Sequence, residues 1–230
     1  MNIKKLMTPA VMAFIVLGLI TGCSSVTSST SDMSSATSLS PEKIKELRKT
    51  YPVSTGSPQN VDLQDLTFKQ VLDYTDSVII AEVIQQMPDF SVDLITEPGT
   101  PEGNLAEKLE AAGEQPYRPE FTSFQVKVDE VVTGEEVGST INLIYNSEFK
   151  GIEPELKPGM KIVVAVKKGV GKEQEGSYSF TRYGTYYVVE DDYVLSAFEG
   201  QSEEMRGFSQ DTNGYKLDNL ISEIKALKSN

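Results

Sequence analysis

Hydrophobic and polar positions alternate along much of this chain in short stretches that are typical of β-strands. The run at 77–84 is apolar apart from Ser77 and Glu82 and is rich in β-branched residues, which predicts a buried strand. The segments at 124–128 and 141–145 alternate between apolar and polar residues, as half-buried strands do. Five or six strands are expected in all, within the segments 77–84, 124–134, 141–145, 161–167, 186–190 and 193–198.

Two further segments have helical spacing. Residues 66–72 form a short amphipathic pattern, in which Thr67 and Gln70 are placed as a capping box. Apolar residues recur at helical spacing from Leu217 to Leu227, with an acid early and lysines late, as the helix dipole favours. Asp191 and Asp192 predict the turn of a hairpin, and Pro158-Gly159 predicts a type II turn.

These elements predict an α+β protein that is mainly β, with a small antiparallel barrel of five to six strands and flanking short helices. The series SVIIAEV, FQVKVDEVVTGEEVGSTINL, LKPGMKIVVAV and YGTYYVVEDDYVLS resembles the OB-type barrel of netrin-like and metalloproteinase-inhibitor-like domains, which also occurs in uncharacterised bacterial surface proteins. The resemblance covers residues 77–198 and implies the fold. Animal members rely on disulfides that this chain lacks, so an inhibitor activity is not carried over.

The N-terminus has the features of an exported protein. Lys4 and Lys5 precede an apolar run at 6–20, which is shorter than the ~20 residues of a membrane-spanning helix. The run ends in Ile20-Thr21-Gly22-Cys23, which resembles the lipobox of bacterial lipoproteins. This resemblance implies that the Cys23 thiol receives a diacylglyceryl group and that signal peptidase II removes residues 1–22. The alternative is a chance cysteine in an ordinary signal peptide.

The residues after Cys23 are expected to form a tether to a cell membrane. Serine and threonine dominate 24–40, and Pro41 favours a short helix up to Thr50. We therefore expect a lipidated, flexible segment at 23–60, followed by a single globular domain at 61–230, on the extracytoplasmic face.

The net charge of the chain argues against nucleic acid as a partner. The chain has a net charge of −13, and removal of Lys4 and Lys5 with the signal takes this to −15. A protein this acidic is repelled by nucleic acid and by anionic headgroups, so the lipid, and not a basic patch, is expected to hold it at the membrane.

The residue types also exclude several kinds of catalysis. The chain has no histidine, so Ser-His-Asp and Cys-His catalysis and imidazole zinc sites are excluded. No phosphate-binding or nucleophile-elbow motif occurs. The stretch from Asp211 to Gly214 has the wrong spacing for a calcium loop and favours an Asn-Gly turn that caps the last helix. We expect no metal and no cofactor.

Carboxylates remain as candidate catalytic groups. A hydrolase acting on the cell envelope would need two of them across a cleft. No candidate is distinguished by its surroundings in the sequence, and solvated surface acids are the favoured interpretation: Glu120, Asp129, Glu130, Glu148 and Glu153.

Binding to an envelope protein or polymer is therefore the expected function, without enzymatic activity. Tyrosines are the candidate binding residues, although core packing is the favoured alternative because tyrosine is common in strands: Tyr178, Tyr183, Tyr186, Tyr187 and Tyr193.

The long connection from Met87 to Glu120 is the second candidate binding region. It is expected to contain a short helix that is capped by Asn104 and Glu107, buries Leu105 and Leu109, and stops at Gly113. A partner-binding arm and an acidic cover over one end of the barrel fit this pattern equally well.

Overall fold

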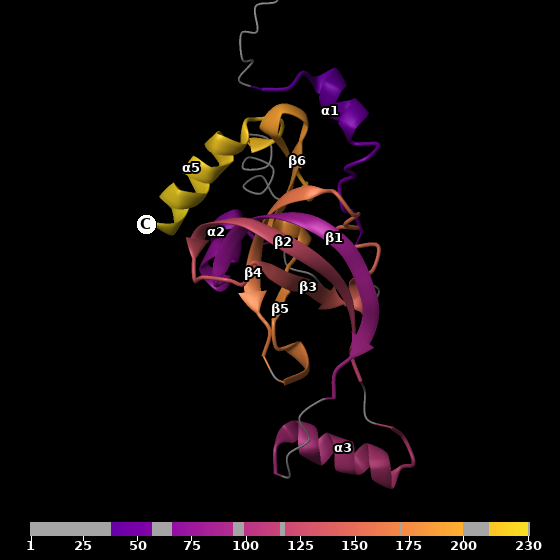
Figure 1. The fold of residues 1–230 in the computed structure, drawn as a ribbon. Coiled ribbons are helices and arrows are strands. Elements are labelled where there is room, and N and C mark those ends of the chain that lie inside the picture. The colour runs from indigo at the N-terminus through magenta and orange to yellow at the C-terminus, as the bar shows by residue number, and fades with distance from the viewer. Residues whose placement is uncertain are drawn as a thin grey trace, which may run out of the picture. The chain divides into compact units, whose positions relative to one another are not determined.

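Seven strands, in the part of the chain that the structure describes, form one mixed sheet. The computed structural model describes residues 38–56, 66–93, 99–115, 118–170, 172–199 and 212–229. The strands are β1 (Ser77–Ser91), β2 (Glu120–Gly134), β3 (Thr140–Asn146), β4 (Lys161–Lys168), β5 (Ser177–Ser179), β6 (Thr185–Val189) and β7 (Tyr193–Ser196). They lie in the order β1-β2-β3-β5-β4-β6-β7 (Figure 1).

Four α-helices accompany the sheet within the same described ranges: α1 (Pro41–Leu47), α2 (Phe68–Tyr74), α3 (Pro101–Ala111) and α5 (Leu217–Lys228). The predicted class, α+β with mostly strands, is confirmed. None of the helices in the described residues is long and apolar enough to cross a membrane.

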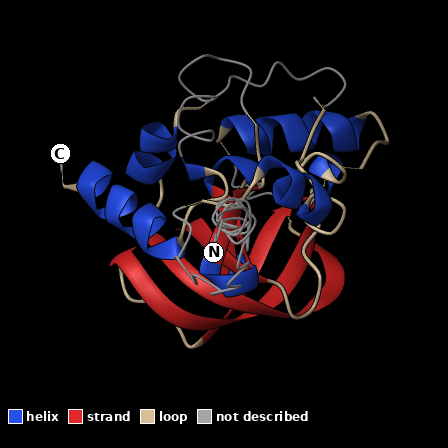
Figure 2. Ribbon diagram, turned by 90° about the horizontal axis from the view of Figure 1, so that it is seen from above, coloured by secondary structure: helices blue, strands red, loops and turns tan. Residues whose placement is uncertain are grey.

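Five of the strands close into a ring. β1 pairs with β2 along one edge and with β4 along the other, where Ser77 to Glu82 lie opposite Val166 to Lys161. β5 lies between β3 and β4, so the ring runs β1-β2-β3-β5-β4 and returns to β1, and Figure 2 shows the strands curving round.

The expectation of an antiparallel sheet of five to six strands is wrong in two respects. The three-residue strand β5 gives no hydrophobic pattern long enough to recognise, and it brings the number of strands to seven. β3 and β5 are parallel, whereas the other pairs of the ring are antiparallel. Because five is odd, strand directions cannot alternate all the way around a closed ring, and one pair must be parallel.

Apolar side chains are buried on both sides of the ring. Ile79 points into the interior core with Phe124 and Val164. Ile80, the next residue, belongs to an outer core formed with Leu220 and Ile224 of α5. Full burial of side chains of this size contributes about 1.5–3 kcal/mol each. Two-sided burial explains why residues 77–83 are almost all apolar, and it confirms the predicted buried strand.

The predicted capping box and turn are both present. Thr67 and Gln70 form the capping box of α2, each side chain accepting the other residue's backbone N–H. Gly159, at a φ of +82°, completes a turn in which the Met160 N–H donates to the Lys157 carbonyl over 3.1 Å. Lys228 of α5 donates to the Leu72 carbonyl at the end of α2, which ties the two outer helices together.

The folded domain begins earlier than the predicted boundary at residue 61. Residues 38–56 pack against the domain: Ser38 pairs with Tyr215, beside the open edge of β7, and Leu47 is buried in the interior core. The Arg48 guanidinium donates to the Ser196 carbonyl over 2.8 Å, and the Ser54 N–H donates to the Ala197 carbonyl over 2.7 Å. An edge strand presents unpaired backbone groups, and this segment satisfies some of them. The predicted signal, Cys23 and the tether up to Thr37 lie outside the described residues.

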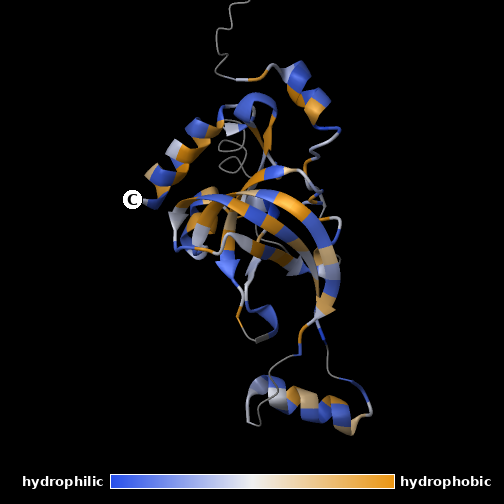
Figure 3. Ribbon diagram, viewed as in Figure 1, coloured by the Kyte–Doolittle hydropathy of each residue, from blue (hydrophilic) through white to orange (hydrophobic). Residues whose placement is uncertain are grey.

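The connection from 87 to 120 is shorter than predicted because both of its ends belong to strands. β1 and β2 continue as a two-stranded ribbon in which Ser91 lies opposite Glu120, and the rings of Phe90 and Phe121 stack at 5.7 Å. The remaining connection, 92–119, holds α3, which lies beyond the ends of β1 and β2 and carries both hydrophobic and hydrophilic residues (Figure 3).

The prediction for α3 is right at its C-terminal end and wrong before it. The helix begins at Pro101 with Thr100 as its N-cap, so the predicted cap at Asn104 and Glu107 is wrong. Leu105 is 57% exposed, so the predicted buried face is also wrong there. Gly113 does end the helix, at a φ of +75°, and the Glu114 N–H donates to the Leu109 carbonyl over 2.8 Å.

These contacts predict that the domain folds without α3. Replacement of residues 93–118 by Asn-Gly, which suits a two-residue hairpin turn, should change the free energy of unfolding in urea by less than about 1 kcal/mol. The Asp93–Arg118 pair that is lost is exposed and worth little. Loss of cooperative unfolding in this variant would show instead that the connection is structural.

Candidate functional site

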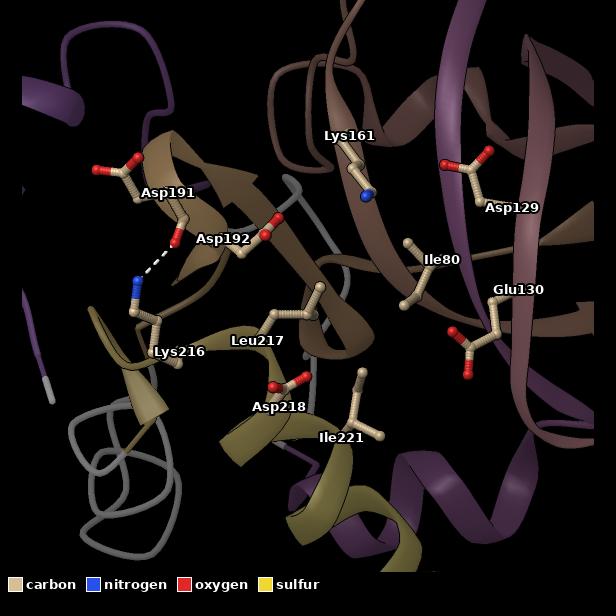
Figure 4. Close-up of a pocket in the computed structure, with 10 residues that line it drawn as sticks. All are labelled: Ile80, Asp129, Glu130, Lys161, Asp191, Asp192, Lys216, Leu217, Asp218 and Ile221. Atoms are coloured by element: carbon tan, nitrogen blue, oxygen red, sulfur yellow. Dashed lines mark hydrogen bonds between the residues drawn. The ribbon is translucent and has the colours of Figure 1, made fainter. Parts of the chain in front are cut away.

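A cleft of about 520 Å³ opens between the start of α5, the turn between β6 and β7, and strands β1, β2 and β4 (Figure 4). We call it the acidic cleft. Its lining consists of Ile80, Asp129, Glu130, Lys161, Asp191, Asp192, Lys216, Leu217, Asp218 and Ile221.

A β-bulge in β2 supplies two of the carboxylates. Ile80 lies opposite Glu130 and Ala81 lies opposite Val128, so Asp129 is an extra residue on the β2 side. Regular alternation would send Asp129 and Glu130 to opposite faces of the sheet, but a bulge changes the direction of side chains locally. Both residues line the acidic cleft.

The turn between β6 and β7 supplies two more carboxylates, those of Asp191 and Asp192. Asp191 and Asp192 have φ values of 53° and 57°, a left-handed conformation that aspartate tolerates better than most residues. The predicted hairpin around these residues is therefore confirmed. Lys216 fixes the turn from the other side, because its ammonium group donates to the Asp191 carbonyl over 2.7 Å and lies 3.8 Å from the centre of the Tyr193 ring.

The first turn of α5 completes the cleft. Asp218 lies at the positive end of the helix dipole, where a carboxylate is favourable. Ile221 provides apolar surface, and Leu217 and Ile80, which belong to the outer core and are 8% and 4% exposed, add only their outermost atoms. The cleft therefore combines an apolar floor with charged walls.

The charge of the lining is negative. Five carboxylates and two lysines give a net charge of −3. All five carboxylates are solvent-exposed. Among the ion pairs of the described residues none involves Lys161, whose side chain extends between Asp192 and Asp129 in Figure 4.

The exposed acids of the cleft could bind a ligand of opposite charge. No group of three or more acidic side chains in the described ranges is arranged to hold a metal ion. Exposed carboxylates around an apolar floor can attract and hold a cationic ligand that also has an apolar part.

The tyrosines do not form the exposed surface considered from the sequence. All five are buried, and the alternation of the strand sends Tyr186 and Tyr187 to opposite cores. The interior core holds Tyr178, Tyr187 and Tyr193, and the outer core holds Tyr183 and Tyr186. The tyrosines therefore pack in the two cores, as the favoured alternative expects.

The other candidate acids are dispersed. Glu120 begins β2, and Glu148 lies in the turn after β3; neither lines the cleft. Asp211 lies outside the described residues, and Asn213 and Gly214 do form the predicted turn. The N-cap of α5 is Lys216, so the predicted cap by the Asn-Gly turn is wrong. The Asn213 side chain instead accepts from the Arg48 guanidinium and the Ser196 N–H.

Glu153 is partly buried outside the cleft and has an unusual pKa. Burial raises the pKa of its carboxyl group to about 7, although the Arg182 backbone N–H that it accepts and the Arg182 charge oppose the rise. Arg182 is 4% exposed, donates to the Gly56 carbonyl and packs against the Phe198 ring. Glu153 and Arg182 thereby join the loop before β4, the start of β6 and the N-terminal segment.

The fold and the cleft define a mixed α+β protein with a charged surface cleft. No protein-family model matches this chain, and no curated protein matches it significantly.

The pKa of Glu153 predicts a specific pH dependence. Because the pKa is about 7 in the folded state against 4.5 for an ordinary glutamate, the folded state favours the protonated form. This contribution to stability is complete below about pH 4.5 and is lost as the pH rises through 7. Glu153→Gln should abolish that loss and be more stable than the wild type above pH 7, by on the order of 1–3 kcal/mol.

The measurement is the unfolding free energy of both proteins between pH 4 and about pH 8. Glu175→Gln, at an exposed position, is the matched control and should follow the wild-type curve. A constant difference between Glu153→Gln and the wild type at all pH values would contradict the assignment.

Proposed function

We propose that this chain is a lipid-anchored, extracytoplasmic binding protein without enzymatic activity, and that its acidic cleft binds a positively charged segment of a partner in the cell envelope. The observation that carries this proposal is the cleft itself, whose lining combines five exposed acidic residues with the apolar residues Ile80, Leu217 and Ile221. Lysine and arginine side chains fit such a site because their stems are apolar and their ends are charged.

The same proposal includes an OB-type barrel for the five-stranded ring. The order β1-β2-β3-β5-β4 with closure onto β1 supports it, as does the packed apolar interior. The segments that carry the resemblance to netrin-like and metalloproteinase-inhibitor-like domains supply β1, β2, β3, β4, β6 and β7. The ring supports a resemblance in fold, and the proposed function rests on the cleft.

The membrane anchor rests on the lipobox at Ile20 to Cys23. Two acyl chains on Cys23 would hold the protein stably, whereas a single chain binds only marginally. A subunit of a membrane complex is one form that such a binding protein takes. The alternative of a carboxylate-dependent hydrolase gains no support from the cleft, because it would require a buried acid opposite a second carboxylate.

The anchor predicts a simple fractionation result. Cys23→Ala should remove the lipidation site and shift the protein from the membrane fraction to the soluble fraction, while Ser24→Ala should stay with the membrane. Labelling with a radioactive fatty acid should follow the same pattern. A Cys23→Ala protein that remains in the membrane fraction would contradict lipid anchoring.

Binding in the cleft predicts a charge-specific loss of affinity. The probe is a synthetic ten-residue peptide of alternating lysine and leucine, titrated calorimetrically into the mature chain carrying Cys23→Ala. The double variant Asp191→Asn, Asp192→Asn should weaken binding roughly tenfold at low salt, since an exposed charge pair contributes up to about 1 kcal/mol. Asparagine also tolerates the left-handed conformation of the turn.

Glu173→Gln, Glu175→Gln is the matched control, because it removes two charges from a loop whose residues do not line the cleft. It should leave the affinity within about twofold of the parent, a difference that long-range screened charges can account for. Equal losses in both double variants would show that the peptide responds to net charge and not to the cleft.

A further inference from the structure

The N-terminal segment enters the fold directly beside the acidic cleft. Ser38 pairs with Tyr215, and the next residue, Lys216, lines the cleft. Lys43 of α1 forms an ion pair of 2.9 Å with Glu190, the residue before Asp191. The cleft therefore lies within a few residues of the point where the chain from Cys23 reaches the domain.

The chain between the lipidation site and this point is short. Residues 24–37 number 14. The flexible tether expected from the sequence would have a root-mean-square span of about 20 Å at this length, and no chain of 14 residues can exceed about 50 Å. A tether that ended at residue 60, as expected from the sequence, would let the domain extend much further from the membrane.

We propose that the acidic cleft binds a basic membrane-proximal segment of a protein embedded in the same membrane. This inference rests on the proposed function and adds the location of the partner, which is the membrane that holds the lipid anchor. The short connection would keep the cleft close to the bilayer surface, and the charge of the cleft is complementary to lysine and arginine. A partner held in the same membrane is met at a high effective concentration, so weak contacts with exposed carboxylates suffice.

The apolar floor of the cleft favours a protein segment over a cationic lipid headgroup. Leu217, Ile221 and Ile80 offer contacts to side-chain stems and to apolar residues between the charges. A headgroup is small and polar, and its acyl chains stay in the bilayer, so it would leave this floor uncovered.

Vesicles that contain the lipidated protein and a peptide test this inference. The peptide has an apolar transmembrane helix and an alternating lysine-leucine extension of ten residues, and the lipid is zwitterionic phosphatidylcholine. Binding is read by energy transfer between a dye on the extension and a dye on the domain. The variants are an insertion of 40 Gly/Ser residues after Thr30 and the double variant Asp191→Asn, Asp192→Asn.

We expect the insertion to lower the effective concentration about twofold, because both molecules already move freely in the membrane plane and the tether sets only the spread of the domain in height, which grows as the square root of tether length. The peptide density needed for half-maximal transfer should rise by a similar factor, and the double variant should weaken binding with either tether. Unchanged binding after the insertion would overturn the membrane-proximal partner, yet leave the cleft as a cation site.

Two further outcomes are distinguishable. If vesicles of cationic lipid without peptide protect the cleft from the soluble lysine-leucine peptide as well as the transmembrane peptide does, the ligand is a headgroup and the inference fails. If neither the lipidated nor the soluble chain binds any lysine-leucine peptide, the proposed function itself fails.

Discussion

The hydrogen bonds between β1 and β4 join two strands that are distant in the sequence, and they close the ring. Without them β1 would be an edge strand of a sheet open on one side, and its two apolar faces could not both be covered. Because the ring has five strands, closure also requires the parallel pair of β3 and β5. The same register determines the floor of the acidic cleft, since Ile80 of β1 lies opposite Glu130 on one side and Val163 on the other.

Much of this fold follows from local signals. Binary patterning and capping locate α2, α5 and six of the seven described strands, because burial and caps act within a few residues. What patterning misses depends on distant contacts. β5 is three residues long and is held by its neighbours. Pro41 does begin the predicted short helix, but nothing local in residues 38–56 indicates that they pack against the domain. α3 is the opposite case. Its ends are capped by local groups, yet its Leu105 is exposed and not packed against the domain.

The cleft was harder to predict than the fold. Regular alternation would place Asp129 and Glu130 on opposite faces of the sheet. A bulge, which has no signature in this sequence, places both in the same cleft. Lys161, Lys216 and Asp218 belong to three separate elements, and only the closed ring and the position of α5 bring them together. The turn at Asp191-Asp192 was visible in the sequence as a turn, but its role in the cleft was not. The tyrosines are buried, as the favoured interpretation of core packing expects, although tyrosine is also common at interfaces.

The central claim is that the acidic cleft is where this protein meets a cationic partner. Backbone amide NMR spectra of the soluble Cys23→Ala chain, recorded while the lysine-leucine peptide is added, test it most directly. The account predicts saturable shifts confined to residues around Asp129, Lys161, Asp192 and Asp218, with little change at α3. Shifts spread over the acidic surface in general, or centred on α3, would contradict it.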